Sequence, residues 1–127
     1  MENPVKELLQ EQDAFKFQIN DITRLCHSLS VNAGWHDNAR EDGTMLALIH
    51  SEISEALEGI RKDLNDDHLS HRKMAEVELA DAMIRIMDFA GSKGYDLGGA
   101  LIEKLIYNTQ RADHKKENRE KANGKKF

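Results

Sequence analysis

Residues 76–90, EVELADAMIRIMDFA, decide the fold class of this chain. Their apolar side chains recur at the three- and four-residue spacing of an α-helix and cover most of its circumference. The polar side chains fall in one narrow stripe, which holds Glu78, Asp81, Arg85 and Asp88. The segment therefore predicts a largely buried helix that carries two acids, Glu78 and Asp81, on one face.

Residues 51–59, SEISEALEG, repeat this acid spacing with Glu52 and Glu55. Glu52 falls inside the apolar arc of a second predicted helix, and Glu55 lies on its edge. A buried carboxylate costs several kcal/mol unless a positive charge pairs with it. Few basic residues are available for four acids, so a shared divalent cation is the simplest partner, and oxygen-only ligands favour Mg²⁺, Mn²⁺ or Ca²⁺. A solvated acidic face is the alternative for either pair alone.

The rest of the chain also predicts helices and no strands, and hence an all-α bundle of four main helices. Asn3 and Pro4 predict the start of a first helix whose apolar stripe continues to Leu29. Such a long stripe predicts that the helix also packs against a partner chain. Residues 30–43 predict a loop. The other helices are expected from Asp42 to about Lys62, from a cap at Ser70 to Gly91 or Gly94, and from a cap at Asp96 to Arg111.

Length and composition indicate one cytoplasmic domain. The 127 residues contain no apolar run of the ~20 residues that a membrane span needs, and the N-terminus does not resemble a signal peptide. Cys26 is the only cysteine, which excludes an intrachain disulfide and fits a reducing compartment. No membrane partner is expected.

Charge is unevenly distributed. Residues 111–127 carry seven Lys and Arg against three Asp and Glu, whereas the rest of the chain is acidic and the net charge is −5. An acidic body disfavours nucleic acid as a partner. We expect a helical domain over residues 1–116 and a basic tail over 117–127, which either frays or folds back over an acidic site holding a phosphorylated ligand.

The fourth predicted helix supplies positive charge. Lys104, Asn108 and Arg111 fall at i, i+4 and i+7, on one face. Lysine neutralises phosphate as a point charge and arginine binds it through two hydrogen bonds, although a solvated polar face explains the spacing equally well. The chain has no Glu-x-x-His motif of the kind that di-iron bundles use, so its oxygen-only acid pairs favour Mg²⁺ chemistry on phosphates.

The order of these motifs resembles the MazG-like proteins of the all-α NTP pyrophosphatase superfamily. Glu-x-x-Glu in residues 51–59 is followed after 22 residues by Glu-x-x-Asp in residues 76–88, and then by Lys-x-x-x-Asn-x-x-Arg in EKLIYNTQRADHK, residues 103–115. The phrases GWHDNARE and ALIHSEISEALEGIRKD also look like the phage and bacterial branch of this family. The resemblance covers roughly residues 30–127.

The resemblance implies a four-helix-type bundle that forms a homodimer or homotetramer and hydrolyses nucleoside triphosphates, with deoxynucleotides somewhat favoured. The products would be a monophosphate and pyrophosphate, with Mg²⁺ as cofactor and Mn²⁺ as a possible substitute. The resemblance makes four residues the metal ligands and catalytic residues: Glu52, Glu55, Glu78 and Asp81. It also brings three residues to the phosphates or sugar: Lys104, Asn108 and Arg111.

Two features leave alternatives open. Several relatives have two adjacent glutamates where this chain has Ser51 and Glu52, which favours a non-catalytic interaction or nucleotide-sensing module with a vestigial acidic pocket as the alternative function. Trp35 and His36 lie in the loop before the first acid pair. Trp35 either stacks on a nucleotide base, with His36 beside it, or plugs the loop onto the core.

Overall fold

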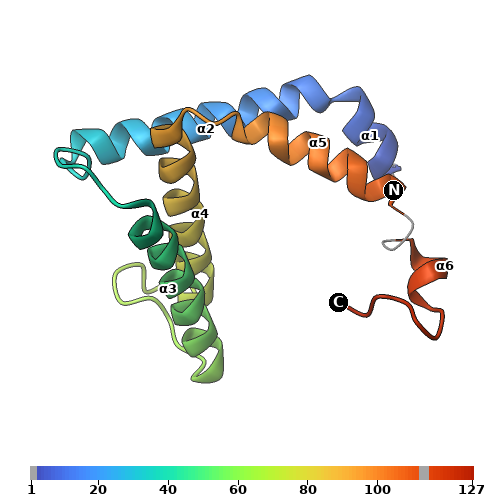
Figure 1. Cartoon of the computed structure of the whole chain (residues 1–127). Coiled ribbons are helices and arrows are strands. Elements are labelled where there is room, and N and C mark those ends of the chain that lie inside the picture. Colours follow the sequence, from blue (N-terminus) through green and yellow to red (C-terminus); the bar gives the residue numbers. More distant parts are fainter. Residues whose placement is uncertain (1–2, 112–114) are drawn as a thin grey trace. The chain divides into compact units, whose positions relative to one another are not determined.

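The computed structural model describes residues 3–111 and 115–127, and within these ranges it contains helices and no strand (Figure 1). The all-α prediction is therefore confirmed. The helices are α1 (Pro4–Gln10), α2 (Gln12–Asn32), α3 (Asp42–Arg61), α4 (Met74–Lys93), α5 (Leu97–Gln110) and α6 (Lys116–Arg119). Residues 112–114, which belong to the EKLIYNTQRADHK segment and to the expected domain 1–116, lie outside the described residues, as do residues 1–2.

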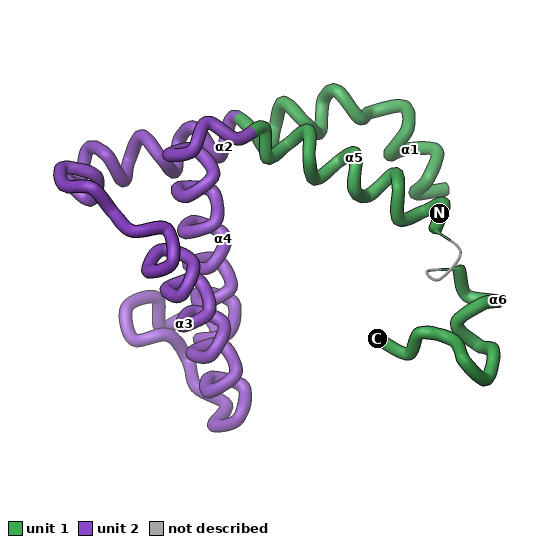
Figure 2. The backbone as a smooth tube through the Cα atoms, viewed as in Figure 1, with its two compact units in different colours: residues 1–20, 96–127 green, residues 21–95 purple. Residues whose placement is uncertain are grey.

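The chain divides into two compact units, coloured separately in Figure 2. One unit comprises Met1–Asn20 and Asp96–Phe127, and the other comprises Asp21–Tyr95. Helix α2 contributes residues to both units. Among the described residues, no helix combines the length and the apolar character that a membrane crossing requires.

The unit of residues 21–95 is built on the extensive packing of α3 against α4. Small or flexible side chains, namely Met45, Ala56, Ala82, Met87 and Ala90, are buried in it. Gly59 lets the helices approach closely, because a Cβ there would lie 2.9 Å from Cβ of Met74. The two acid-bearing helices therefore lie side by side.

Both ends of α4 are fixed by local chemistry. The predicted cap at Ser70 is wrong, because residues 62–73 form a turn in which the Met74 amide donates to the Leu64 carbonyl, and α4 begins only at Met74 with Lys73 as its N-cap. The carboxylate of Glu76 accepts a hydrogen bond from the Lys73 amide at 3.2 Å. At the other end Gly94 adopts φ 69°, the left-handed conformation that glycine permits, so the predicted stop is confirmed.

The other unit contains α1, α5, α6 and the first part of α2. Asn3 Oδ1 accepts the Val5 amide at 3.0 Å, as the predicted cap requires. The predicted continuous first helix is wrong, because the backbone leaves the helical region at Glu11, with φ −107° and ψ 15°. The side chain of Gln12 donates to the carbonyl of Leu9 at 3.0 Å and compensates for the break. Helix α2 then continues to Asn32, beyond the predicted end.

Helix α5 begins at a polar junction with α2. Asp96 Oδ1 accepts the Gly99 amide at 2.8 Å, so Asp96 caps the helix as predicted. Asn20 donates to the same oxygen at 2.8 Å and accepts the Gly98 amide at 2.7 Å. Beyond residue 114, the basic tail forms α6 and folds on itself, since Lys126 Nζ donates to the carbonyls of Arg119 and Lys121.

Candidate metal and ligand site

Three carboxylates meet between α3 and α4. Glu52, Glu55 and Glu78 each offer an oxygen atom, and these atoms all lie within 4.8 Å of one another. Glu52 and Glu78 are each 8% exposed, whereas Glu55 lies at the exposed edge. Helical i, i+3 spacing aligns Glu52 with Glu55, and the α3–α4 packing places Glu78 opposite them. We refer to these three residues as the acid cluster.

The acid cluster shares a proton at neutral pH. The hydrogen bond with Glu52, burial and the neighbouring Glu55 together raise the pKa of Glu78 to about 8. Burial alone would raise the pKa of Glu52 as well, but hydrogen bonds from Glu78 and Arg85 outweigh it and lower that pKa. Glu78 is therefore the protonated donor of the pair, and Glu52 is the ionised acceptor.

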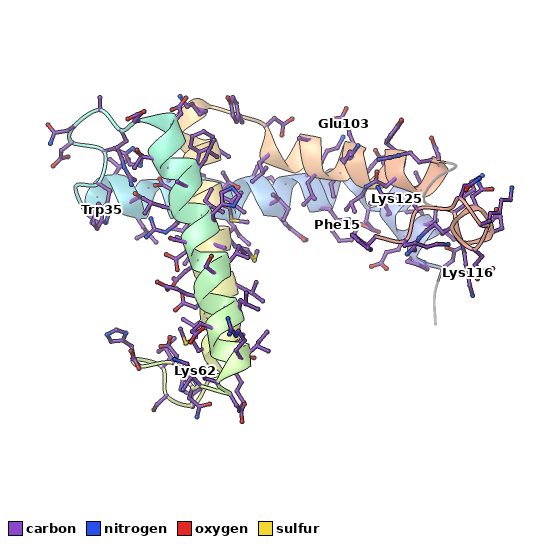
Figure 3. All side chains as sticks on the ribbon, turned by 60° about the horizontal axis from the view of Figure 1, so that its bottom comes forward. Phe15, Trp35, Lys62, Glu103, Lys116 and Lys125 are labelled. Carbon is purple, nitrogen blue, oxygen red and sulfur yellow. The ribbon has the colours of Figure 1, made fainter. Side chains whose placement is uncertain are left out.

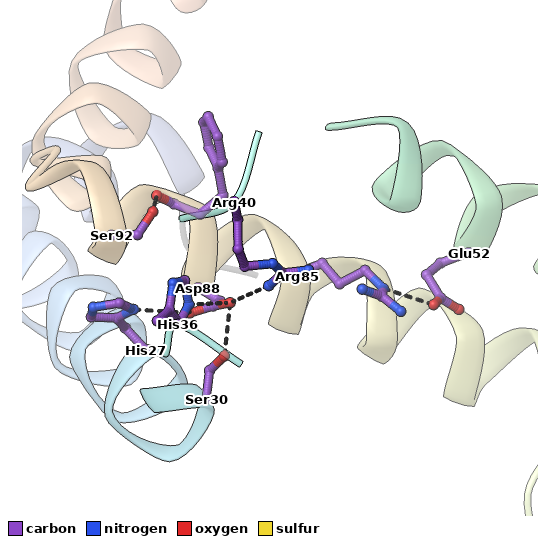
Figure 4. A network of polar contacts seen from close by, with 9 residues as sticks. His27, Ser30, His36, Arg40, Glu52, Arg85, Asp88 and Ser92 are labelled. Carbon is purple, nitrogen blue, oxygen red and sulfur yellow. Dashed lines mark hydrogen bonds and ion pairs between the residues drawn. The ribbon is translucent and has the colours of Figure 1, made fainter. Parts of the chain in front are cut away.

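Arg85 and Asp81 adjoin the acid cluster from α4. Arg85 Nε donates a hydrogen bond of 2.8 Å to Glu52 Oε1 (Figure 4). Asp81 is not among the residues whose carboxylate oxygens lie within 4.8 Å of one another. Burial and the negative charge of Glu52 nevertheless raise the pKa of Asp81. All four acids that the sequence singled out thus lie on the facing helices α3 and α4.

The acid cluster fits a hard divalent cation. Its donors are oxygen atoms only, the ligand type that Mg²⁺ and Mn²⁺ prefer. Glu78 Oε2 is buried and has no hydrogen-bond partner in the described part of the chain. A buried oxygen without a partner is destabilising unless some other group satisfies it, and a metal ion held by Glu52, Glu55 and Glu78 would do so.

A cavity of about 660 Å³ adjoins the acids. Apolar side chains of α2, α3 and α4, including Leu29, Leu48 and Ile84, form much of its wall. Glu52 and Asp81 line it as well, so the cavity and the acid cluster share a residue. A volume of this size, apolar with a few charged groups, suits an organic ligand with an anionic end near the metal ligands.

Trp35 and His36 take different positions in the loop of residues 33–41. Trp35 lines the cavity and is 66% exposed, so it does not plug the core (Figure 3). His36 Nε2 instead lies 2.9 and 3.1 Å from the two carboxylate oxygens of Asp88. The structure therefore separates the aromatic side chain at the cavity from the histidine that anchors the loop.

Asp88 is the centre of a second group of polar contacts that the sequence did not predict (Figure 4). It is 6% exposed and lies beside side chains of α2 and of the loop, which are His27, Ser30, His36 and Arg40. We call these five residues the Asp88 network. Its one sequence signal was the place of Asp88 in the polar stripe of residues 76–90. The residues that contact Asp88 come from distant parts of the chain, so the stripe alone did not reveal them.

Cys26 also lines the cavity. Burial and the nearby negative charge of Asp88 raise the pKa of its thiol. A raised pKa disfavours the thiolate, which is the nucleophilic form. These surroundings therefore disfavour Cys26 as a nucleophile.

The three residues expected near phosphate lie on or next to α5, in the other unit. Lys104 Nζ lies 4.8 Å from the centroid of the Tyr107 ring, and the guanidinium carbon of Arg111 lies 5.7 Å from it. Asn108 Oδ1 is buried and lacks a hydrogen-bond partner among the described residues. The structure thus brings Lys104 and Arg111 to the same aromatic ring in one unit, and the acids together in the unit of residues 21–95.

Comparison of the chain with family models, with curated proteins and with solved structures gave no match. What the site can do chemically therefore follows from its own donor atoms, charges and cavity.

Proposed function

We propose that this protein is a Mg²⁺-dependent pyrophosphohydrolase that converts (deoxy)nucleoside triphosphates into the monophosphate and pyrophosphate. The observation that carries the proposal is the convergence of Glu52, Glu55 and Glu78, with the buried Glu78 Oε2 lacking a partner, beside a cavity with an aromatic side chain. Such a site would accommodate a metal, a polyphosphate and a base. The motif resemblance to MazG-like proteins supports the same reaction.

The residues have separate roles in this proposal. Glu52, Glu55, Glu78 and Asp81 would hold the metal, which when bound neutralises phosphate oxygens and lowers the pKa of a water molecule. Glu78 must lose its shared proton to act as an anionic ligand. Trp35 offers a face on which a base can stack. The motif resemblance alone assigns Lys104 and Arg111 to the phosphates, where they would stabilise charge as water attacks the α-phosphorus and pyrophosphate leaves.

We further propose that a second copy of the chain completes a four-helix bundle around the site. Apolar residues of α3 and α4 stay exposed on the single chain, between 49% and 57% for Ile53, Leu57, Leu79 and Met83. Two packed helices with this much exposed apolar surface are typical of half a bundle. Homodimerisation, or a homotetramer of two such pairs, would cover it.

The direct test is product analysis with a panel of canonical and modified nucleoside triphosphates and Mg²⁺. We expect pyrophosphate and the monophosphate; orthophosphate, or no turnover of any nucleotide, contradicts the proposal. Glu52→Gln and Asp81→Asn should lose metal binding and activity while the helical circular dichroism signal persists. Glu58→Gln is a matched control, because Glu58 pairs with Lys62 at 2.8 Å on the same helix, outside the acid cluster.

A nucleotide-binding module without turnover is the second candidate. The ion pair between Arg85 and Glu52 favours it, because a side chain already neutralises one acid of the cluster. Thermal shift with Mg²⁺ and a nucleotide separates the two functions, since any ligand that prefers the native state raises its melting temperature. A shift without pyrophosphate release identifies the module.

A further inference from the structure

The Asp88 network links three segments of one unit. Asp88 comes from α4, His27 and Ser30 from α2, and His36 and Arg40 from the loop of residues 33–41. His27 Nδ1 lies 2.9 Å from Asp88 Oδ1, and Ser30 Oγ donates to Asp88 Oδ2 at 3.0 Å. An ionised carboxylate only accepts hydrogen bonds, so both histidines must donate to it through protonated ring nitrogens.

Three connections lead from Asp88 to Trp35. His36, the next residue after Trp35, bonds Asp88 directly. The guanidinium of Arg40 lies 3.7 Å from Asp88 Oδ2, and its carbon lies 5.9 Å from the centroid of the Trp35 ring. Ser30 bonds Asp88 through its hydroxyl, while its carbonyl accepts the Trp35 amide at 3.1 Å. Asp88 thus fixes the backbone of Trp35 on both sides and one face of its ring.

The charges in the Asp88 network favour a hydrogen-bonded anchor over a second metal site. Two imidazoles and a carboxylate are a ligand set that Zn²⁺ accepts, and their donor atoms lie within 4.8 Å of one another. However, Arg40 already supplies the cation, and a dication bound there would face its positive charge at close range. Both Asp88 oxygens also already take part in hydrogen bonds, with the Ser30 hydroxyl and with His36.

We propose that Asp88 is a positioning residue that, through His36, Arg40 and Ser30, holds Trp35 against the cavity and thereby sets nucleotide affinity. This inference rests on the proposed function for its kinetic consequence, but the geometry that it describes does not. Asp88 lines the cavity together with Arg40 and is not part of the acid cluster, of which only Glu52 lines the same cavity. Loosening the loop therefore weakens ground-state binding and leaves the metal ligands in place.

Trp35 reports on its own position, because it is the only tryptophan. In His36→Leu the loop loses its bond to Asp88, and we expect acrylamide to quench Trp35 fluorescence more efficiently than in the parent, by up to about 1.5-fold because Trp35 is already 66% exposed. His36→Gln is the conservative rescue, because its amide nitrogen can donate near the position of Nε2. It should restore quenching to the parent value. Asp88→Asn should behave as His36→Leu does, provided that its circular dichroism shows it folded.

Kinetics separate positioning from a general loss of structure. We expect His36→Leu to raise KM about tenfold with kcat changed by less than about threefold, because stacking acts in ground and transition states alike. Asp42→Asn is the control: its ion pair with Lys93, at 2.6 Å, also joins the start of α3 to α4 but does not touch the Asp88 network. It should leave quenching and KM unchanged.

The outcomes distinguish the two proposals. If no nucleotide is turned over but His36→Leu exposes Trp35 and His36→Gln does not, the proposed reaction fails and the positioning role stands. If quenching is the same in all variants, or if kcat falls while KM is constant, the positioning role is wrong. If Zn²⁺ raises the melting temperature of the parent but not of His36→Leu, the Asp88 network is a metal site and the positioning role is wrong.

Discussion

Arg85 Nε donates to Glu52 Oε1 at 2.8 Å, so a cation of the chain itself lies against the acid cluster. The side chain of Glu52 is 10% exposed and that of Arg85 is 38% exposed. A nearly buried carboxylate thus has a partner that can turn toward solvent. Arg85 stabilises Glu52 when no metal is bound, and it competes with a metal for the same oxygen atom.

Replacement of Arg85 by Gln should therefore have opposite effects on metal affinity and on stability. We expect the apparent Kd for Mn²⁺ to fall by about three- to tenfold, because the competing charge is gone. Without metal, the free energy of unfolding should fall by about 1–2 kcal/mol, because Glu52 loses its ionic partner. Isothermal titration and urea unfolding measure the two effects.

The control for this experiment is Arg72→Gln. Arg72 pairs with Glu76 at 3.7 Å, and both side chains are more than half exposed. Exposed pairs contribute little, so neither the Mn²⁺ affinity nor the stability should change measurably. A Kd that is unchanged in Arg85→Gln would show that Glu52 does not bind the metal.

The raised pKa of Glu78 predicts the pH dependence of stability. Its ordinary value is 4.5 and its value in the folded chain is about 8, so the folded state holds an extra proton between these limits. Without metal, this contribution is complete below about pH 4.5 and is lost as the pH rises through about 8. Urea unfolding between pH 5 and pH 9 should therefore show a decline that Glu78→Gln removes.

Mg²⁺ should reverse this dependence. A cation binds the deprotonated carboxylate, so its affinity rises with pH until Glu78 is fully ionised, and binding below about pH 8 releases a proton. Proton release is measured by titration calorimetry in two buffers that differ in ionisation enthalpy. Equal heats in both buffers would place the metal away from Glu78.

The parts of the fold that depend on local chemistry could be predicted from the sequence. Asp96 and Gly94 act within one helical turn, and their roles follow from side-chain length and backbone freedom. The break at Glu11 was not predicted, because Glu is a good helix former, although the apolar stripe has its one polar interruption at the next residue, Gln12.

In the candidate site too, the features that depend on local sequence could be predicted and those that depend on contacts between distant residues could not. The acid pairs could be predicted as one group, because i, i+3 spacing and the apolar surroundings of Glu52 and Glu78 are visible in the sequence. The contact between His36 and Asp88 spans 52 residues, and no local pattern connects a loop histidine to one aspartate of a helix. Arg85 was visible in the polar stripe, but its choice of Glu52 depends on how α3 packs on α4.

Gly91 provides a test of how α2 packs on α4. A Cβ on Gly91 would lie 2.6 Å from Cβ of His27 and 2.9 Å from its Cγ, and these atoms are too close to the backbone to move aside. Gly91→Ala should lower the free energy of unfolding by about 1–3 kcal/mol, as overpacking does. Gly43→Ala is the matched control, because a Cβ there meets nothing within 4 Å and should stabilise α3 slightly. Thermal unfolding of both variants checks the contrast.

Two apolar surfaces compete as the interface for a second copy. One is the face of α2 that carries the predicted apolar stripe, with Ile22 49% and Leu29 59% exposed. The other is the α3–α4 surface, where Leu57 is 57% exposed. The α3–α4 surface adjoins the acid cluster, so its burial would shield the metal site from water. We therefore expect it to contribute more to self-association.

Leu57→Glu should convert the oligomer to monomer at micromolar concentration. A charge placed in an apolar interface loses its hydration without gaining a partner, and losing one central anchor weakens association by about 30-fold or more. Leu69→Glu is the control, because Leu69 is 47% exposed but lies in the turn between α3 and α4. Size-exclusion chromatography with light scattering measures both. If Ile22→Glu gives monomers while Leu57→Glu stays associated, the interface lies on α2. A parent chain that is monomeric at every concentration rules out both surfaces.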